Sequence, residues 1–188
     1  MIEVIREEQY RVSNWSGGKT KELYLWPVDG SYADRDFRVR ISSATVELPE
    51  SDFTYLKGVQ RYLMNLSGKM VLTINDGEEV DMKDGRILHF SGEDKVHCVG
   101  CATDFNLMLK GAEGMMFSLK SGESCRMKKE CEYFVYGAQS FRLTGPDGTQ
   151  TTVKKGESCY LCGEDGNFVP EGFEGVIPAV EISKKEGI

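Results

Sequence analysis

The amino-acid sequence predicts an all-β protein with few or no helices, built from two similar antiparallel barrels. Three observations support this prediction. Turn-forming segments recur along the chain, short apolar runs lie between them, and turns of the first half reappear in the second half at a constant distance. No segment has the long 3.6-residue periodicity of an amphipathic helix.

Glycine-containing turns divide the chain into short pieces. They are NDG at 75–77, KDG at 83–85, SGED at 91–94, PDG at 146–148, KKG at 154–156 and CGED at 162–165. The runs between them include MVLTI, ILHF, SFRL and SCYL, which have the length and composition of strands. Because glycine readily adopts the positive φ at which hairpins close, this pattern predicts antiparallel strands joined by tight turns.

The turns of the two halves repeat at an offset of 71 positions. Gly77 matches Gly148, Gly85 matches Gly156, and GED at 92–94 matches GED at 163–165. The same offset also pairs Tyr62 with Tyr133, Leu72 with Leu143, Thr73 with Thr144, Asp76 with Asp147 and Lys83 with Lys154. The repeat predicts one strand-and-turn unit used twice, although a single larger sandwich with coincidental hairpins is an alternative.

A twofold repeat of this size resembles a double cupin, in which two RmlC-like jelly-roll barrels lie in one chain. We expect an N-terminal cupin-like barrel at residues 1–115 and a C-terminal cupin-like half at residues 116–188, both in one compact unit. The second half contains no recognisable site motif. Its expected role is structural, closing strand edges that a single barrel would leave open.

Composition narrows the classes of partner. The chain has 188 residues with 23 basic and 30 acidic side chains, a net charge of −7. Nucleic acid is an unlikely general partner, because phosphate binding needs a basic face. No apolar segment suggests a signal peptide or membrane span, so a cytoplasmic protein without a membrane partner is expected. A homodimer is compatible with the sequence.

Cysteine and histidine could both indicate a metal site. Cys98 and Cys101 form one C-x-x-C pair, and Cys159 and Cys162 form another. Residues three apart on a strand point to opposite faces, so buried or incidental thiols are favoured over metal or redox sites. The chain has two histidines and no His-x-His. We therefore expect no metal and no cofactor.

The segment NWSGGKTKE at 14–22 contains GKT, the end of a phosphate-binding P-loop. A P-loop has a glycine five positions before the glycine of GKT, but Ser13 stands there. The preceding residues are mostly charged or polar, and KELYLWPV after Thr20 alternates like a strand. The segment therefore does not predict a nucleotide site.

Four stretches together resemble the HutD/Ves family of bacterial bicupin proteins, which is linked to histidine utilisation and stress. They are WSGGKTKE at 15–22, RISSATV at 40–46, a segment at 53–63 with Gly58 and Arg61, and FSG at 90–92 followed by DFNLM at 104–108. The resemblance implies a bicupin fold and a small-molecule-binding regulatory protein. Val39 stands where the family usually has Trp, a departure that concerns ligand specificity more than fold.

Polar residues of these stretches form the expected ligand site. Strand alternation places Arg40 with Ser42, Thr20 with Glu22, and Asp104 with Asn106. A guanidinium group can bind a carboxylate through two N–H groups. The expected ligand-binding residues are Trp15, Thr20, Glu22, Arg40, Ser42, Arg61, His89, Asp104 and Asn106. The expected structural residues are Gly17, Gly18, Gly58, Phe90, Gly92 and Phe105.

Some of these assignments have alternatives. Trp15 is either an apolar plug or a wall of the ligand site, with the plug favoured. Arg40 either binds an anion or pairs internally with Glu22 or Asp104. His89 is expected to face the barrel lumen.

The favoured function is a regulatory protein that binds a carboxylate metabolite in a metal-free cavity. The family resemblance implies a ligand of the formylglutamate or urocanate class and a role in moderating histidine utilisation. One alternative is a metal-free isomerase or hydrolase that uses Glu22, Asp104 or His89 as acid or base. Another is a scaffold or assembly protein whose cavity is filled by its own side chains.

Overall fold

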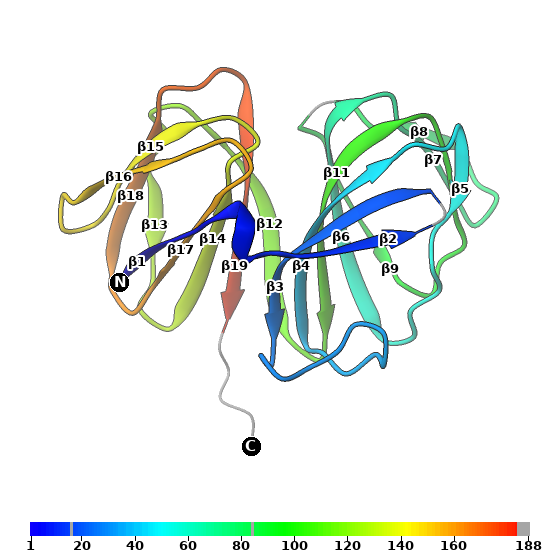
Figure 1. Ribbon diagram of the computed structural model, residues 1–188, viewed down its shortest axis with the longest axis horizontal. Helices are drawn as coiled ribbons and strands as arrows, with labels where there is room; N and C mark the ends of the chain where they lie inside the picture. Colours follow the sequence, from blue (N-terminus) through cyan, green and yellow to red (C-terminus); the bar gives the residue numbers. More distant parts are fainter. Residues whose placement is uncertain (16, 84, 184–188) are drawn as a thin grey trace. The chain divides into compact units, whose positions relative to one another are not determined.

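The computed structural model describes residues 1–15, 17–83 and 85–183. Ser16 of the WSGG stretch and Asp84 of the KDG turn lie outside the described residues. Within them the chain forms β-strands joined by turns, and its helical part is one 3-10 turn, η1 (Glu7–Gln9) (Figure 1). The described residues include no helix long and apolar enough to cross a membrane. The all-β prediction is confirmed.

The chain divides into two compact units. The N-terminal unit is Tyr10–Gly111, and the C-terminal unit combines Met1–Gln9 with the chain from Ala112 onward. Each unit contains one large and one small antiparallel sheet within its described residues.

The N-terminal unit has a six-stranded and a four-stranded sheet among its described residues. In spatial order, the large sheet contains β2 (Arg11–Trp15), β3 (Gly18–Trp26), β4 (Val39–Val46), β11 (Ala102–Lys110), β6 (Val59–Gly68) and β9 (Ile87–Ser91). The small sheet contains β5 (Glu50–Asp52), β10 (Val96–Val99), β7 (Val71–Ile74) and β8 (Glu79–Asp81).

The C-terminal unit has a five-stranded and a four-stranded sheet over its described part. The large sheet contains β1 (Ile2–Ile5), β17 (Ser158–Cys162), β14 (Cys131–Tyr136), β19 (Val176–Ser183) and β12 (Glu113–Lys120). The small sheet contains β13 (Cys125–Met127), β18 (Gly166–Glu171), β15 (Phe141–Thr144) and β16 (Gln150–Val153).

The two units share one strand order, as the repeat predicts. Strands β4, β11, β6 and β9 are adjacent in one unit in the order that β12, β19, β14 and β17 follow in the other. The small sheets match strand for strand. Gly85 and Gly156, which the offset pairs, both adopt positive φ, of 77° and 90°. The duplicated antiparallel architecture is thus present in the fold.

Two details differ from the repeat seen in the sequence. At the first NDG turn, Asn75 and Asp76 adopt the positive φ rather than Gly77. Tyr62 and Tyr133 are not structurally equivalent, because Tyr133 lies in an apolar core whereas Tyr62 stacks on the exposed His89. Since side chains alternate along a strand, a shift of one residue reverses the face, and this sequence match is coincidental.

The first strand belongs with the second half of the chain. All four residues of β1 pair with β17, so Met1–Gln9 lies in the C-terminal unit, whereas the sequence analysis assigned residues 1–115 to one barrel. The added strand satisfies backbone N–H and C=O groups of β17 that would otherwise stand at a sheet edge. Sequence position does not reveal such a long-range pairing.

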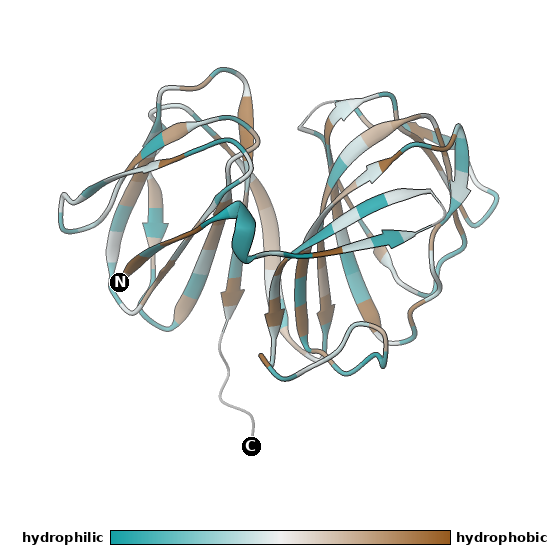
Figure 2. Cartoon of the chain, viewed as in Figure 1, coloured by the Kyte–Doolittle hydropathy of each residue, from teal (hydrophilic) through white to brown (hydrophobic). Residues whose placement is uncertain are grey.

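Both units have an apolar core, and hydropathy alternates along many of the strands (Figure 2). In the N-terminal unit, Leu63, Met70, Leu72 and Val96 belong to a fully buried cluster. In the C-terminal unit, a larger cluster includes Tyr133, Leu143, Val153, Leu161, Phe168 and Ile177. Burial of each such side chain contributes about 1.5–3 kcal/mol relative to exposure.

The fold predicts a strong requirement for glycine at position 18. Gly18 has φ of 148°, and a Cβ there would lie 2.0 Å from the backbone oxygen of Thr45 on β4. We expect Gly18→Ala to lower the free energy of unfolding by roughly 2–4 kcal/mol, from backbone strain and the clash together, as measured by urea denaturation.

Gly58→Ala is the matched control. Gly58 also has positive φ, 70°, but no other atom lies within 4 Å of its Cβ position. Equal losses of stability in the two variants would contradict the assignment of Gly18 to close packing against β4.

Candidate functional site

The N-terminal unit contains a cavity of about 210 Å³. Its walls come from β2, β3, β4, β6 and β11, from β5 with the two residues after it, and from the loop before β4. The lining residues are Ser13, Trp15, Thr20, Tyr32, Arg40, Ser42, Ala44, Val46, Asp52, Phe53, Thr54, Arg61, Asp104, Asn106 and Met108.

Two neighbouring strands form the floor of this cavity. On β4, Arg40, Ser42, Ala44 and Val46 line it, and on β11 Asp104, Asn106 and Met108 do so. The antiparallel register pairs Asp104 with Ala44, Asn106 with Ser42, and Met108 with Arg40. Because directly opposite residues share a face of the sheet, the register gathers these side chains on one surface.

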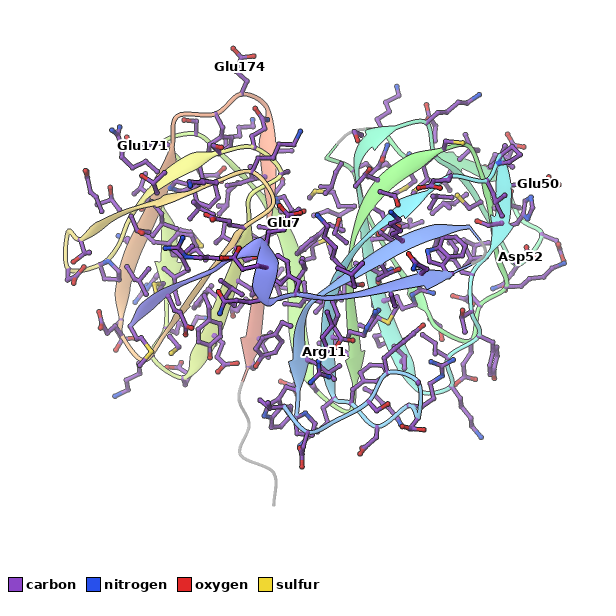
Figure 3. All side chains as sticks on the ribbon, in the orientation of Figure 1. Glu7, Arg11, Glu50, Asp52, Glu171 and Glu174 are labelled. Atoms are coloured by element: carbon purple, nitrogen blue, oxygen red, sulfur yellow. The ribbon has the colours of Figure 1, made fainter. Side chains whose placement is uncertain are left out.

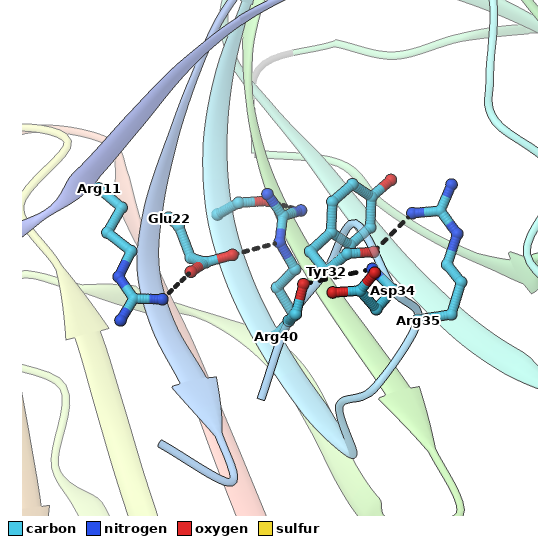
Figure 4. A network of polar contacts seen from close by, with 8 residues as sticks. Arg11, Glu22, Tyr32, Asp34, Arg35 and Arg40 are labelled. Carbon is cyan, nitrogen blue, oxygen red and sulfur yellow. Dashed lines mark hydrogen bonds and ion pairs between the residues drawn. The ribbon is translucent and has the colours of Figure 1, made fainter. Parts of the chain in front are cut away.

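Arg40 is buried and held by several groups. Its Nε donates to Glu22 Oε2 at 3.0 Å, and its Nη1 donates to Ser42 Oγ at 3.1 Å. Its Cζ lies 3.9 Å from the centroid of the Tyr32 ring. Arg11 Nη1 approaches the other oxygen of Glu22 at 3.9 Å (Figure 4). Arg40 therefore combines the internal pairing with a place in the cavity wall.

Glu22 lies diagonally across from Arg40, next to an irregularity in β3. The register of β3 against β4 shifts between Glu22 and Tyr24, so that Glu22 pairs with Ser42 while Leu25 pairs with Arg40. Such a bulge changes the direction of side chains along a strand. Glu22 does not line the cavity, but its carboxylate neutralises a guanidinium group that does.

Arg61 is the second guanidinium group of the cavity, and its side chain is 5% exposed. Its Cζ lies 4.9 Å from the ring centroid of Phe53 and 5.1 Å from that of Phe90. Burial lowers the pKa of Arg61 to about 10, an effect that Tyr32 and Asp104 oppose. The guanidinium group is thus charged at neutral pH, yet its Nε has no hydrogen-bond partner among the described residues.

Asp104 and Asn106 supply the buried oxygen atoms of the floor. Burial raises the pKa of Asp104 to about 7, against the opposing effects of Arg61, the Ala44 backbone N–H and Arg40. One oxygen of each side chain, Oδ1, has no hydrogen-bond partner in the described part of the chain. Buried polar atoms in native proteins are normally paired. The cavity therefore contains one unpaired donor, Arg61 Nε, and two unpaired acceptors, Asp104 Oδ1 and Asn106 Oδ1, that suit a ligand.

More exposed residues surround the floor. Trp15 is 37% exposed and lines the cavity, so it acts as a wall and not as the buried plug that the sequence analysis favoured. Thr20 on β3 pairs with Ser13 on β2, and both line the cavity. Asp52 on β5, which Figure 3 labels, is exposed, and its carboxylate lies 2.9 Å from His97 Nδ1. These side chains differ from the buried floor in being accessible to solvent.

The expected structural residues lie around the cavity without lining it. A Cβ on Gly17 would lie 2.0 Å from the Trp15 ring, and one on Gly92 would lie 2.5 Å from the Leu56 carbonyl oxygen. The Gly58 N–H donates to Glu93 Oε1 at 2.9 Å. Phe90 is buried against Arg61, and Phe105 is fully buried between Asp104 and Asn106 along β11.

The structure corrects the placement of His89. It is exposed and stacks on Tyr62, with ring centroids 4.3 Å apart. The register pairs Tyr62 with His89, while Arg61 and Leu63 on either side of Tyr62 are buried. His89 therefore lies on the outer face of the sheet, away from the cavity, and a one-residue difference in register decides this.

Sequence reasoning missed several lining residues. Tyr32 lies in the loop before β4, and Asp52, Phe53 and Thr54 lie at and after β5. Phe53 belongs to a family-like motif, which could have indicated a role. Nothing in the sequence around Tyr32 distinguishes it from any other loop aromatic.

The cysteines are free thiols. Cys98 on β10 is buried, whereas Cys101 is exposed in the connection between β10 and β11. Burial raises the pKa of Cys98 to about 11 and that of Cys159 to about 12, so both remain protonated near neutrality. Among the described residues, no cluster of three or more His, Cys, Asp or Glu side chains could hold a metal ion.

Several solved structures resemble this chain. The conserved protein of unknown function PA5104 from Pseudomonas aeruginosa PAO1 is 20% identical, with a TM-score of 0.79 over 97% of this chain and 98% of that one. HutD from Pseudomonas fluorescens SBW25, in a formate condition, is 20% identical, with a TM-score of 0.77 and the same coverages.

A cupin 2 conserved barrel domain protein from Leptotrichia buccalis is 15% identical, with a TM-score of 0.58 over 96% of this chain and 95% of that one. These similarities confirm the predicted double-cupin fold. No curated protein sequence matches the chain.

The HutD family model matches residues 7–172. The match includes the whole N-terminal unit, part of the C-terminal unit and every lining residue of the cavity. The resemblance seen in the sequence motifs is therefore confirmed, and this chain belongs to the HutD family.

Proposed function

We propose that this protein binds a small carboxylate-bearing metabolite in the cavity of the N-terminal unit and acts as a regulatory binding protein in histidine utilisation. The observation that carries the proposal is the buried Arg61 guanidinium group, whose Nε has no hydrogen-bond partner among the described residues. A carboxylate is the group that matches a guanidinium group in both charge and geometry.

The charges of the cavity floor favour one anionic group. Arg40 is already paired with Glu22, whereas Arg61 is opposed by Asp104, whose pKa is raised to about 7 by burial. When Asp104 is protonated, the positive charge of Arg61 in the cavity is uncompensated. Because an unpaired buried charge is costly, a bound carboxylate would stabilise this state.

The size of the cavity favours a small ligand. A volume of about 210 Å³ is smaller than the roughly 300–1,000 Å³ of pockets that bind drug-sized ligands. This space suits a short organic acid, and larger ligands would extend past Trp15 toward solvent. The cavity also argues against a scaffold whose lumen is filled by its own side chains.

The family gives the metabolic context. The HutD name associates this chain with histidine utilisation, and the HutD structure from Pseudomonas fluorescens was obtained in a formate condition. Formate is the smallest carboxylate. Formylglutamate and urocanate, both carboxylates of histidine breakdown, are the ligand class that we propose.

Replacement of Arg61 tests the proposal. Calorimetric titration of the wild-type protein with formylglutamate and urocanate should give millimolar or tighter binding for at least one of them. Arg61→Met removes the charge with little change in side-chain length, and should weaken this binding at least about tenfold, the effect of one lost charge-assisted hydrogen bond.

Arg38→Met is the matched control. Arg38 donates to the Gly111 carbonyl and lies over the Trp26 ring, but it does not line the cavity. The Arg38→Met variant should bind the ligand as the wild-type protein does. Thermal melts should show that both variants fold. Failure of the wild-type protein to bind either acid, or equal binding by the Arg61 and Arg38 variants, would refute the carboxylate site.

The pKa of Asp104 predicts a pH dependence. Above about pH 7 Asp104 is ionised and repels a bound carboxylate, and below about pH 7 it is protonated and does not. The affinity for formate, which stays ionised throughout, should therefore rise as the pH falls from 8 to 6. NMR titration can measure this change, which Asp104→Asn should abolish. An affinity that is independent of pH in the wild-type protein would contradict the role of Asp104.

Asp104 also favours a second candidate function. A carboxyl group with a pKa near neutrality inside a cavity is suited to proton transfer, as in an acid–base enzyme that needs no metal. If the protein is such an enzyme, it should convert a bound acid into a product, which NMR can follow. Asp104→Asn should abolish this conversion but not the binding of the acid. Recovery of each acid unchanged would favour the binding protein.

A further inference from the structure

We infer that the ligand of this cavity carries, besides its carboxylate, a neutral hydrogen-bond donor that the side chain of Asn106 accepts. The inference rests on the proposed function, since it concerns the same cavity and takes the carboxylate at Arg61 as given. It narrows the ligand class to small carboxylates with an amide N–H or a hydroxyl group close to the acid.

The unpaired oxygen atoms on β11 are the basis of this inference. Asn106 and Asp104 line the cavity and are 6% and 4% exposed. In both side chains Oδ1 has no hydrogen-bond partner within residues 1–15, 17–83 and 85–183. A carboxylate ligand only accepts hydrogen bonds, so by itself it could satisfy Arg61 but neither of these oxygen atoms.

The register places donor and acceptor within reach of one small molecule. Arg61 pairs with Met108, and Asn106 is two residues before Met108 on the same face of β11. Diagonal neighbours of this kind on adjacent strands are about 7–8 Å apart. The terminal amide of Asn106 rotates over a broad range, so its oxygen can turn toward a ligand held by Arg61.

The surrounding charges favour a neutral donor over an ammonium group. Arg40 is neutralised by Glu22, but the positive charge of Arg61, which also lines the cavity, would repel an ammonium group placed near it. An amide N–H or a hydroxyl supplies the missing donor without adding charge. Asn106 can accept it whether or not Asp104 is protonated, because an amide does not titrate in this range.

Matched pairs of acids test the inference. N-acetylglycine and 4-oxopentanoate have the same shape and differ by an N–H in place of a CH2 group. Glycolate and propionate differ by a hydroxyl in place of a methyl group. With the wild-type protein at pH 6, where Asp104 is protonated and does not repel carboxylates, NMR titration should show about tenfold tighter binding of N-acetylglycine than of 4-oxopentanoate, as expected for one hydrogen bond to an unpartnered acceptor. Glycolate should likewise bind more tightly than propionate.

Asn106→Leu and a matched control locate the acceptor. Leucine has nearly the shape of asparagine without its oxygen, so both ratios should fall to about one in Asn106→Leu. Asn14→Leu should keep both ratios, because Asn14 is exposed on β2 and does not line the cavity. If Asn106→Leu does not fold, the two ratios in the wild-type protein still test whether the cavity prefers a ligand with a neutral donor.

The outcomes separate the inference from the proposed function. Equal binding of the two acids in each pair would overturn the inference but would not contradict the proposed carboxylate site. Binding of none of the four acids would overturn both. Ratios that persist in Asn106→Leu would overturn the assignment of the acceptor to Asn106.

Discussion

The burial of charged side chains inside a β-barrel is the constraint that shapes this protein. Arg40, Arg61 and Asp104 are each about 95% buried in the N-terminal unit. Moving an isolated charge out of water costs several kcal/mol, so each must be compensated by its surroundings. Much of the local structure around the cavity provides this compensation.

The two guanidinium groups are compensated differently. Arg40 has an ion pair with Glu22, a hydrogen bond to Ser42 and the face of Tyr32. Arg61 lies near the rings of Phe53 and Phe90, and its positive charge is opposed by Asp104. The positive charge of Arg40 is thus compensated within the protein, whereas that of Arg61 is compensated less fully. This difference is why we assign the ligand to Arg61.

The same arrangement of strands surrounds two different interiors in this chain. The strand order of the two units matches, but their interiors differ. On β11 the inward positions include Asp104 and Asn106, whereas the corresponding strand β19 contributes Ile177 and Ala179 to an apolar core. Apolar packing stabilises a unit, and buried polar groups cost stability unless a partner satisfies them. The structure therefore concentrates its buried polar side chains in the N-terminal unit, whereas the corresponding strand of the C-terminal unit contributes to an apolar core.

The sequence by itself determined the all-β class, the duplicated strand pattern and most of the cavity floor. These depend on local signals: turn residues, and the alternation that places Arg40 with Ser42 and Asp104 with Asn106 on one face. Only the tertiary structure decided the rest, because it depends on pairing between distant segments. The register of β6 with β9 put His89 outside, and the pairing of β1 with β17 moved the first residues into the second unit. Tyr32 reaches the cavity from a loop whose path no periodicity describes.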